Sequence, residues 1–142
     1  MKDDLRHLVP IAKADLQRAR AAVDAGYPQV APILGELVGW LRDYNWPVAG
    51  ILAPFLASVG TPLKSHIWSV LRSEDDIWKY WVIGLLVDAL PKTDAEEFRP
   101  ELERLYYSPE PHEVAEGLDE QARTILQKFD WLRAEPIKRP LD

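Results

Sequence analysis

The 142-residue sequence contains no cysteine, a single methionine and no long apolar segment. The absence of cysteine excludes disulfides, thiolate zinc sites, iron–sulfur clusters and a cysteine nucleophile. The longest apolar run lies around residues 81–87 and is far shorter than the ~20 residues that span a bilayer. The first ten residues, MKDDLRHLVP, lack the apolar stretch of a signal peptide. We therefore expect a cytoplasmic protein that stays out of membranes.

Positive charge is also scarce. The chain has 17 Lys and Arg residues against 23 Asp and Glu residues, which gives a formal net charge of −6. Because nucleic acids and anionic membranes require a basic contact surface, we expect neither as a partner. Apolar residues make up 47% of the chain and charged residues 28%, as in ordinary globular proteins. This length and composition predict that residues 1–142 form a single domain.

Apolar residues recur every three or four positions through most of the chain, which predicts an all-α protein without strands. We expect about seven helices, near residues 16–25, 33–41, 47–59, 63–73, 74–90, 98–105 and 118–129. The fifth of these is apolar around nearly its whole circumference, so it should be the central helix. Gly26 and Gly60 follow apolar stripes and should end helices.

The sequence contains twelve prolines, and several of them lie between or within these segments. Pro28, Pro47 and Pro62 follow linkers and should occupy first helical turns, where the missing N–H costs nothing. Pro54 lies inside the third segment and predicts a kink there. Pro100 should bend the sixth helix or delay its start.

Two short patterns recur at a helix-pair spacing. Gly26–Pro28 and Gly60–Pro62 match as Gly-x-Pro, whereas Asp43–Trp46 and Asp75–Trp78 match as Asp-x-x-Trp. Periods of 30–35 residues built from helix–turn–helix units are typical of α-solenoids, and a proline-bent first helix is typical of HEAT repeats. The alternative is a non-repetitive helical bundle whose turns use the same turn residues.

The strings Asn45–Ala49, Leu52–Gly60 and Asp75–Trp81 resemble a small bacterial family of unassigned activity, domain-of-unknown-function family 5071. The resemblance covers roughly residues 5–128 and carries no established catalytic residues. It implies a HEAT-like fold, a right-handed α-α superhelix. We therefore expect helix pairs at about 12–42, 46–72 and 75–107, followed by a capping helix at about 112–131.

Residue patterns for catalysis or metal binding are scarce. His7, His66 and His112 are widely separated and form no metal-binding motif, and no nucleophile elbow or phosphate-binding glycine loop is present. Asp75 and Asp76 are adjacent, so their side chains diverge by about 100° on a helix and suit an N-cap and a first-turn acid. We expect no enzyme, cofactor or metal; the alternative is an enzyme with a carboxylate site near Asp43, Asp75 and Asp76.

Binding of another protein is the predicted function. Six tryptophans are many for this length, and Trp46 and Trp78 suit the core because they recur at matching positions. Trp68 falls beside the buried stripe of its helix, so it is either core or an exposed anchor. The predicted partner-binding residues are Lys64, Trp68, Arg72, Asp75 and Asp76.

Several alternatives remain open for the role of such a module. An immunity or antitoxin protein fits the small acidic chain, and a structural subunit could oligomerise through aromatic residues. We expect a monomer or weak homodimer that binds a protein of unknown identity. Gly35 and Gly39 lie four residues apart, which predicts the close approach of another helix backbone.

Overall fold

The computed structural model describes residues 3–132, and every regular element in this range is helical. This confirms the all-α prediction. The α-helices are α1 (Leu16–Ala25), α2 (Leu34–Gly39), α3 (Pro47–Val59), α4 (Lys64–Leu71), α5 (Asp76–Val82), α6 (Lys92–Ala95), α7 (Arg99–Tyr107), α8 (Pro111–Ala115) and α9 (Leu118–Lys128). Short 3-10 turns lie at Asp3–Leu8, Ala31–Ile33, Trp40–Arg42, Thr61–Leu63 and Glu96–Phe98, and a π-helical turn, Ile83–Val87, continues α5.

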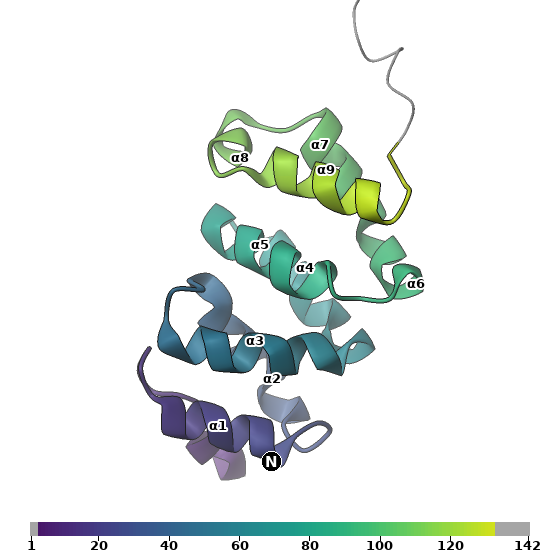
Figure 1. Ribbon diagram of the computed structural model, residues 1–142. Helices are drawn as coiled ribbons and strands as arrows, with labels where there is room; N and C mark the ends of the chain where they lie inside the picture. Colours follow the sequence, from purple (N-terminus) through teal and green to yellow (C-terminus); the bar gives the residue numbers. More distant parts are fainter. Residues whose placement is uncertain (1–2, 133–142) are drawn as a thin grey trace, which may run out of the picture.

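The helices are stacked in chain order, with α1 near one end of the molecule and α7 to α9 at the other (Figure 1). One row consists of α1, α3, α5 with its π-helical turn, and α9, and each member contacts the next. α2 and α7 lie behind this row in the same view, and α2 also contacts α4. Helices two places apart in the chain therefore pack against one another.

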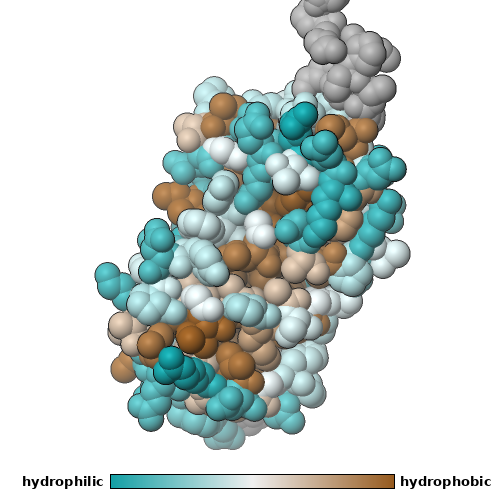
Figure 2. Space-filling model, viewed as in Figure 1, coloured by the Kyte–Doolittle hydropathy of each residue, from teal (hydrophilic) through white to brown (hydrophobic). Residues whose placement is uncertain are grey.

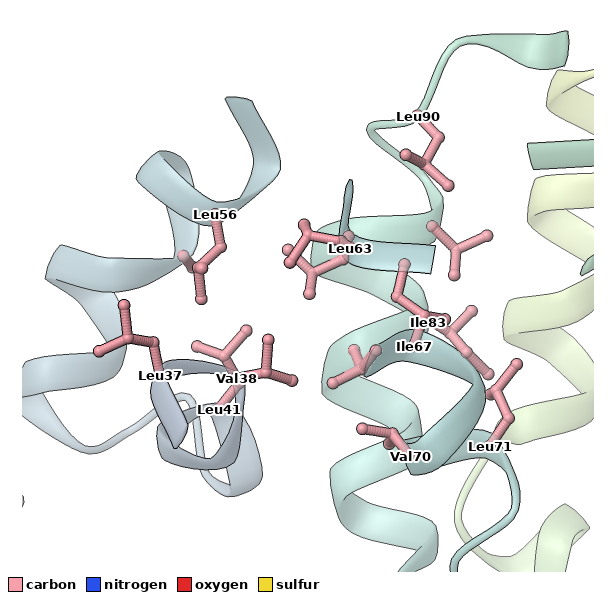
Figure 3. Close-up of a cluster of buried hydrophobic side chains, with 14 of the residues drawn as sticks. Leu37, Val38, Leu41, Leu56, Leu63, Ile67, Val70, Leu71, Ile83 and Leu90 are labelled. Atoms are coloured by element: carbon pink, nitrogen blue, oxygen red, sulfur yellow. The ribbon is translucent and has the colours of Figure 1, made fainter. Parts of the chain in front are cut away.

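The apolar core runs through the whole stack. Figure 3 shows Leu37, Val38 and Leu41 close to Leu56 of α3, and Ile67 of α4 close to Ile83. All six side chains are at most 1% exposed. Burying one such side chain contributes about 1.5–3 kcal/mol relative to leaving it in water. The stack is thus held mainly by contacts between helices that are distant in sequence.

The predicted central helix corresponds to α5 and its π-helical turn. This segment contacts α3 on one side and α9 on the other, as a central helix should. It is not buried all round, however, because Ile77 is 50% exposed and Leu85 is half-buried.

The π-helical turn has a visible cause in a neighbouring side chain. The Gln121 amide donates to the Tyr80 carbonyl at 2.7 Å, and the Asp88 N–H bonds to the carbonyl of Ile83, five residues back. Gly84 leaves room for this amide, since a Cβ there would lie 2.7 Å from the Gln121 nitrogen. A side chain from α9 thus bonds a carbonyl of α5 three residues before the widened turn begins.

The helix ends agree with the sequence at most positions. Gly26 and Gly60 follow α1 and α3 with φ of 76°, the left-handed region that favours glycine, which confirms both stops. Pro47 and Pro62 occupy first turns as expected. The prediction for Pro28 is wrong, because Pro28 lies in the preceding turn and Pro32 takes the first-turn position instead.

The other two proline predictions have different outcomes. Pro100 is the second residue of α7, so the helix starts late, as predicted. Pro54 lies within α3, which is assigned as one helix from Pro47 to Val59, and its ring is exposed. The predicted kink at this position stays a prediction.

The two Asp-x-x-Trp segments have different structures. Asp75 is the N-cap of α5, and its carboxylate accepts from the backbone N–H of Trp78 at 3.0 Å, as predicted. Asp43 lies three residues before Trp46, the N-cap residue of α3. Its carboxylate instead accepts from the backbone N–H of Asn45 at 2.8 Å. The capping helix expected at 112–131 is two helices, α8 and α9, separated at Gly117 with φ of 78°.

Within the described residues, no single helix is long and apolar enough to cross a membrane. Residues 47–59 and 61–71 reach the necessary length and composition only as a pair, which is bent by 112° at the break.

We predict that Leu86→Ala lowers the free energy of unfolding by about 2–5 kcal/mol, because the side chain is only 1% exposed on the central segment. Leu85→Ala is the matched control and should cost clearly less, since Leu85 is half-buried. Denaturation of both variants in urea tests this difference. Equal losses would contradict the one-sided burial of this segment.

Candidate functional site

Trp68 joins α4 to the segment that precedes α7. Its indole N–H donates to a Glu97 carboxylate oxygen at 2.6 Å, and its ring centroid lies 5.0 Å from that of the buried Phe98. The side chain is half-buried rather than freely exposed. Trp68 therefore serves as packing between helices, the core alternative of the sequence analysis.

Lys64 and Arg72, which flank Trp68 on α4, are both engaged. Lys64 Nζ lies 3.1 Å from Asp94 and 3.6 Å from Glu97. The hydrogen bond to Asp94 raises the pKa of Lys64, whereas hydrogen bonds from the Thr61 hydroxyl and Lys64 lower the pKa of Asp94. The Arg72 guanidinium carbon lies 5.0 Å from the Trp68 ring centroid. Lys64 is thus paired with two carboxylates, whereas Arg72 is exposed and rests on the Trp68 ring, and their predicted role in partner binding stays a prediction.

The aspartates of the alternative enzyme site have separate partners. Asp75 caps α5, and Asp43 stabilises the turn before α3. Asp76 contacts Lys79, at 3.3 Å, and His112 Nδ1. Burial would raise the pKa of Asp76, but the hydrogen bonds from His112 and Lys79 lower it below its usual value. Each carboxylate therefore has a local structural role.

The other histidines and metal-ligating groups form no centre. The ring of His66 packs against Gly35, and burial lowers its pKa. Within residues 3–132, no group of three or more His, Asp or Glu side chains is arranged to hold a metal ion.

An open groove of about 550 Å³, which we call the tryptophan groove, lies where α2, the start of α3 and α5 meet. Three tryptophans and one arginine supply most of its large side chains, and two glycines of α2 supply space. The lining residues are Val9, Pro10, Gly35, Glu36, Gly39, Trp40, Arg42, Trp46 and Trp78.

The side chains of the tryptophan groove hold one another in place. The Arg42 guanidinium carbon lies 4.2 Å from the Trp78 ring centroid, and Trp40 meets Trp46 edge-on at 5.7 Å. The indole N–H of Trp78 donates to the backbone carbonyl of Val38 at 3.2 Å. A cation–π contact contributes about 0.5–2 kcal/mol, so the walls are ordered before any ligand arrives.

The two glycines of α2 have another role than predicted. The neighbour that would meet a Cβ at Gly35 is the His66 ring at 3.1 Å, and at Gly39 it is the Arg42 guanidinium at 3.5 Å. Side chains therefore approach these glycines, and the expected close contact with a helix backbone is wrong. Both glycines line the tryptophan groove.

A second depression of about 360 Å³, which we call the acidic pocket, lies beside the start of α5. Its lining residues are Asp43, Asn45, Ile77, Tyr80, Trp81 and Glu116. Consecutive residues of the recurring strings are divided between the two depressions: Asn45 and Ile77 line the acidic pocket, and Trp46 and Trp78 line the tryptophan groove. The face in Figure 2 is mixed, with apolar side chains in separate patches among hydrophilic ones.

Sequence reasoning placed the candidate binding residues on α4 and at the start of α5 and did not identify the two depressions, although Asp43 of the alternative carboxylate site lines the acidic pocket. The signal was present in the strings that carry the family resemblance, because Trp46 and Trp78 occur in them. Assigning these rings wholly to the core concealed the groove, since each is only half-buried.

The chain belongs to the family described as "Domain of unknown function (DUF5071)", whose model matches residues 8–126. A search of curated proteins finds no match to the chain. The matched region includes every residue that lines the tryptophan groove and the acidic pocket.

We predict that Trp68→Ala destabilises the protein by about 2–4 kcal/mol, because it removes the ring against Phe98 and the donor to Glu97. Trp68→Phe keeps a ring and should cost about half as much. Thermal and urea denaturation measure both variants. A loss below about 1 kcal/mol for Trp68→Ala would restore the exposed-anchor interpretation.

We predict that the pair formed by Asp76 and His112 stabilises the fold most between roughly pH 4 and 6.5. The hydrogen bond to Asp76 raises the pKa of His112 above its usual 6.5, so this contribution is complete below that pH and fades as pH rises through the raised value. The pKa of Asp76 is lowered from 3.8, so its contribution is lost as pH falls through the lower value.

Two measurements check this pH dependence. NMR titration of the His112 ring should give a pKa above about 6.5 that falls in Asp76→Asn. The difference in Tm between wild type and His112→Gln should be larger near pH 5.5 than near pH 8.5. A difference that is independent of pH would contradict the ion pair.

Proposed function

We propose that this chain is a cytoplasmic protein-interaction module, a HEAT-like stack of helix pairs that binds a protein partner through the tryptophan groove. The observation that carries the proposal is the groove of about 550 Å³ in which Arg42 lies against Trp78 beside Trp40 and Trp46. Tryptophan and arginine are the residue types that most often dominate binding energy at protein interfaces. Such half-buried, mutually ordered rings lose little conformational entropy on binding.

The HEAT-like part of the proposal is supported by how the helices begin. The segments that contain α2, α4 and α7 each start with a 3-10 turn, and Pro32, Pro62 and Pro100 lie at or just after these turns. The row of α1, α3, α5 and α9 supplies the alternate members of the pairs. A stack of this kind offers an extended surface, which suits binding.

Binding is favoured over catalysis by the partners of the three aspartates. Asp43 and Asp75 accept from backbone N–H groups, and Asp76 is shared between Lys79 and His112. Acid–base catalysis by a carboxylate pair needs both groups at one reacting atom, and each of these is committed to a different structural contact.

The test fills the groove without disturbing the fold. Gly39→Leu places a side chain in the tryptophan groove, and a Cβ there makes only an ordinary 3.5 Å contact with Arg42. Gly50→Leu is the matched control on α3, because Gly50 is exposed and a Cβ there has no neighbour within 4 Å. Each change replaces a helical glycine, so neither should lower Tm.

We predict that a partner captured from native cells by the wild type and by Gly50→Leu is lost or weakened at least tenfold with Gly39→Leu. Quantitative affinity capture, followed by titration of the purified partner, makes the comparison. Equal binding by both variants, with both folded, would show that the tryptophan groove is not the contact surface.

A further inference from the structure

We propose that the acidic pocket receives a lysine or arginine side chain from a basic protein partner. This inference rests on the proposed function, which it deepens by naming the chemistry that the partner presents. It concerns residues that the tryptophan groove does not use, so the two can be tested separately.

The pocket combines aromatic, apolar and acidic walls. Tyr80 and Trp81 meet edge-on with ring centroids 5.2 Å apart, and Tyr44 packs on Trp81 at 5.5 Å. Ile77, on the first turn of α5, is 50% exposed. Asp43 and Glu116 bring carboxylates to the lining, and no Lys or Arg lines it.

Several carboxylates that the structure describes are paired with a cation, and those of the pocket are not. Asp94, Glu103 and Glu113 each lie within 4 Å of a Lys or Arg nitrogen. Neither Asp43 nor Glu116 has such a cation among residues 3–132, and the one hydrogen bond of the Asp43 carboxylate comes from the backbone N–H of Asn45. The pocket therefore holds unneutralised negative charge beside aromatic rings.

A lysine or arginine side chain matches all three walls. Its charged group is attracted by carboxylates and by aromatic ring faces, and its aliphatic stem can cover an exposed Ile77. A volume of about 360 Å³ is near the lower end for ligand sites, which suits one side chain better than a large cofactor. The net charge of −6 would also attract a basic partner over long range.

Three variants isolate the charge from the shape of the pocket. Asp43→Asn keeps an oxygen that can accept from the Asn45 N–H, so the turn before α3 should persist. Glu116→Gln changes an exposed residue at the end of α8 without altering its size. Glu96→Gln is the matched control for each of these single variants, because Glu96 is exposed, lies outside the pocket and its replacement likewise removes one negative charge.

The experiment uses the full chain and probes of defined structure. Nα-acetyl-lysine methylamide and its arginine analogue are titrated by two-dimensional NMR at low salt, with Nα-acetyl-norleucine methylamide as the uncharged analogue. We expect saturable shifts of the Trp81 indole N–H and the Ile77 methyl groups with both cationic probes and not with norleucine. Asp43→Asn and Glu116→Gln should each weaken binding, by at least threefold when combined, and Glu96→Gln should leave it unchanged.

Two results would overturn the proposal. One is an equal response to the norleucine probe, which would make the pocket merely apolar. The other is equal weakening by Glu96→Gln, which would reduce the effect to net charge. Because no partner is needed, a negative result here leaves the capture experiment with Gly39→Leu to decide the proposed function by itself.

Discussion

Every helix that the structure describes in residues 3–132 is too short to be stable alone, and this constraint governs the rest of the structure. The longest, α3, has 13 residues, and α5, α2 and α8 have 7, 6 and 5. Isolated helices shorter than ~12–15 residues are marginal in water, so each element depends on burying its apolar stripe against a neighbour. Stacking meets this need, because helices two places apart in the chain, such as α1 and α3 or α7 and α9, pack against each other along the stack (Figure 1).

Short helices also leave many backbone groups near their ends without a partner in the same helix, and side chains from other layers bond some of these groups. The indole N–H of Trp78 donates to the backbone carbonyl of Val38, and the side-chain amide of Gln121 donates to that of Tyr80. Each bond joins residues about forty positions apart in the sequence. Lys128 Nζ likewise donates to the carbonyl of Asp88. These bonds fix how one layer sits on the next, a matter that non-directional apolar contacts leave loosely determined.

Local chemistry made much of the fold predictable from the sequence. The three- and four-residue spacing located the main helices, Gly26 and Gly60 marked two ends, and Asp75 marked a cap. The errors came from partners far away in the sequence. For Trp68 the sequence leaves the core and anchor alternatives open, because nothing near it in the chain reveals Glu97 and Phe98, which lie some thirty residues on.

Glu113 likewise has a partner that its position in the sequence does not reveal. A carboxylate in the first turn of a helix such as α8 compensates the helix dipole, but its position in the sequence does not reveal the 2.7 Å contact with Arg104 of α7 or the burial to 4% exposure. The hydrogen bonds from Arg104 overcome the effect of burial and lower the pKa of Glu113. A buried carboxylate is tolerated only with such a partner, and the choice of partner is a property of the stack.

The first turn of α5 connects this stacking to both candidate surfaces. Ile77 and Trp78 are consecutive residues, so their side chains point about 100° apart around the helix, one to the acidic pocket and the other to the tryptophan groove. Asp75 fixes where the helix begins, and Asp76 ties that turn to Lys79 and to His112 of α8. A rotation of α5 would therefore move the walls of both depressions together. A partner that covers both would meet one rigid surface, set by the contacts that end one layer and start the next.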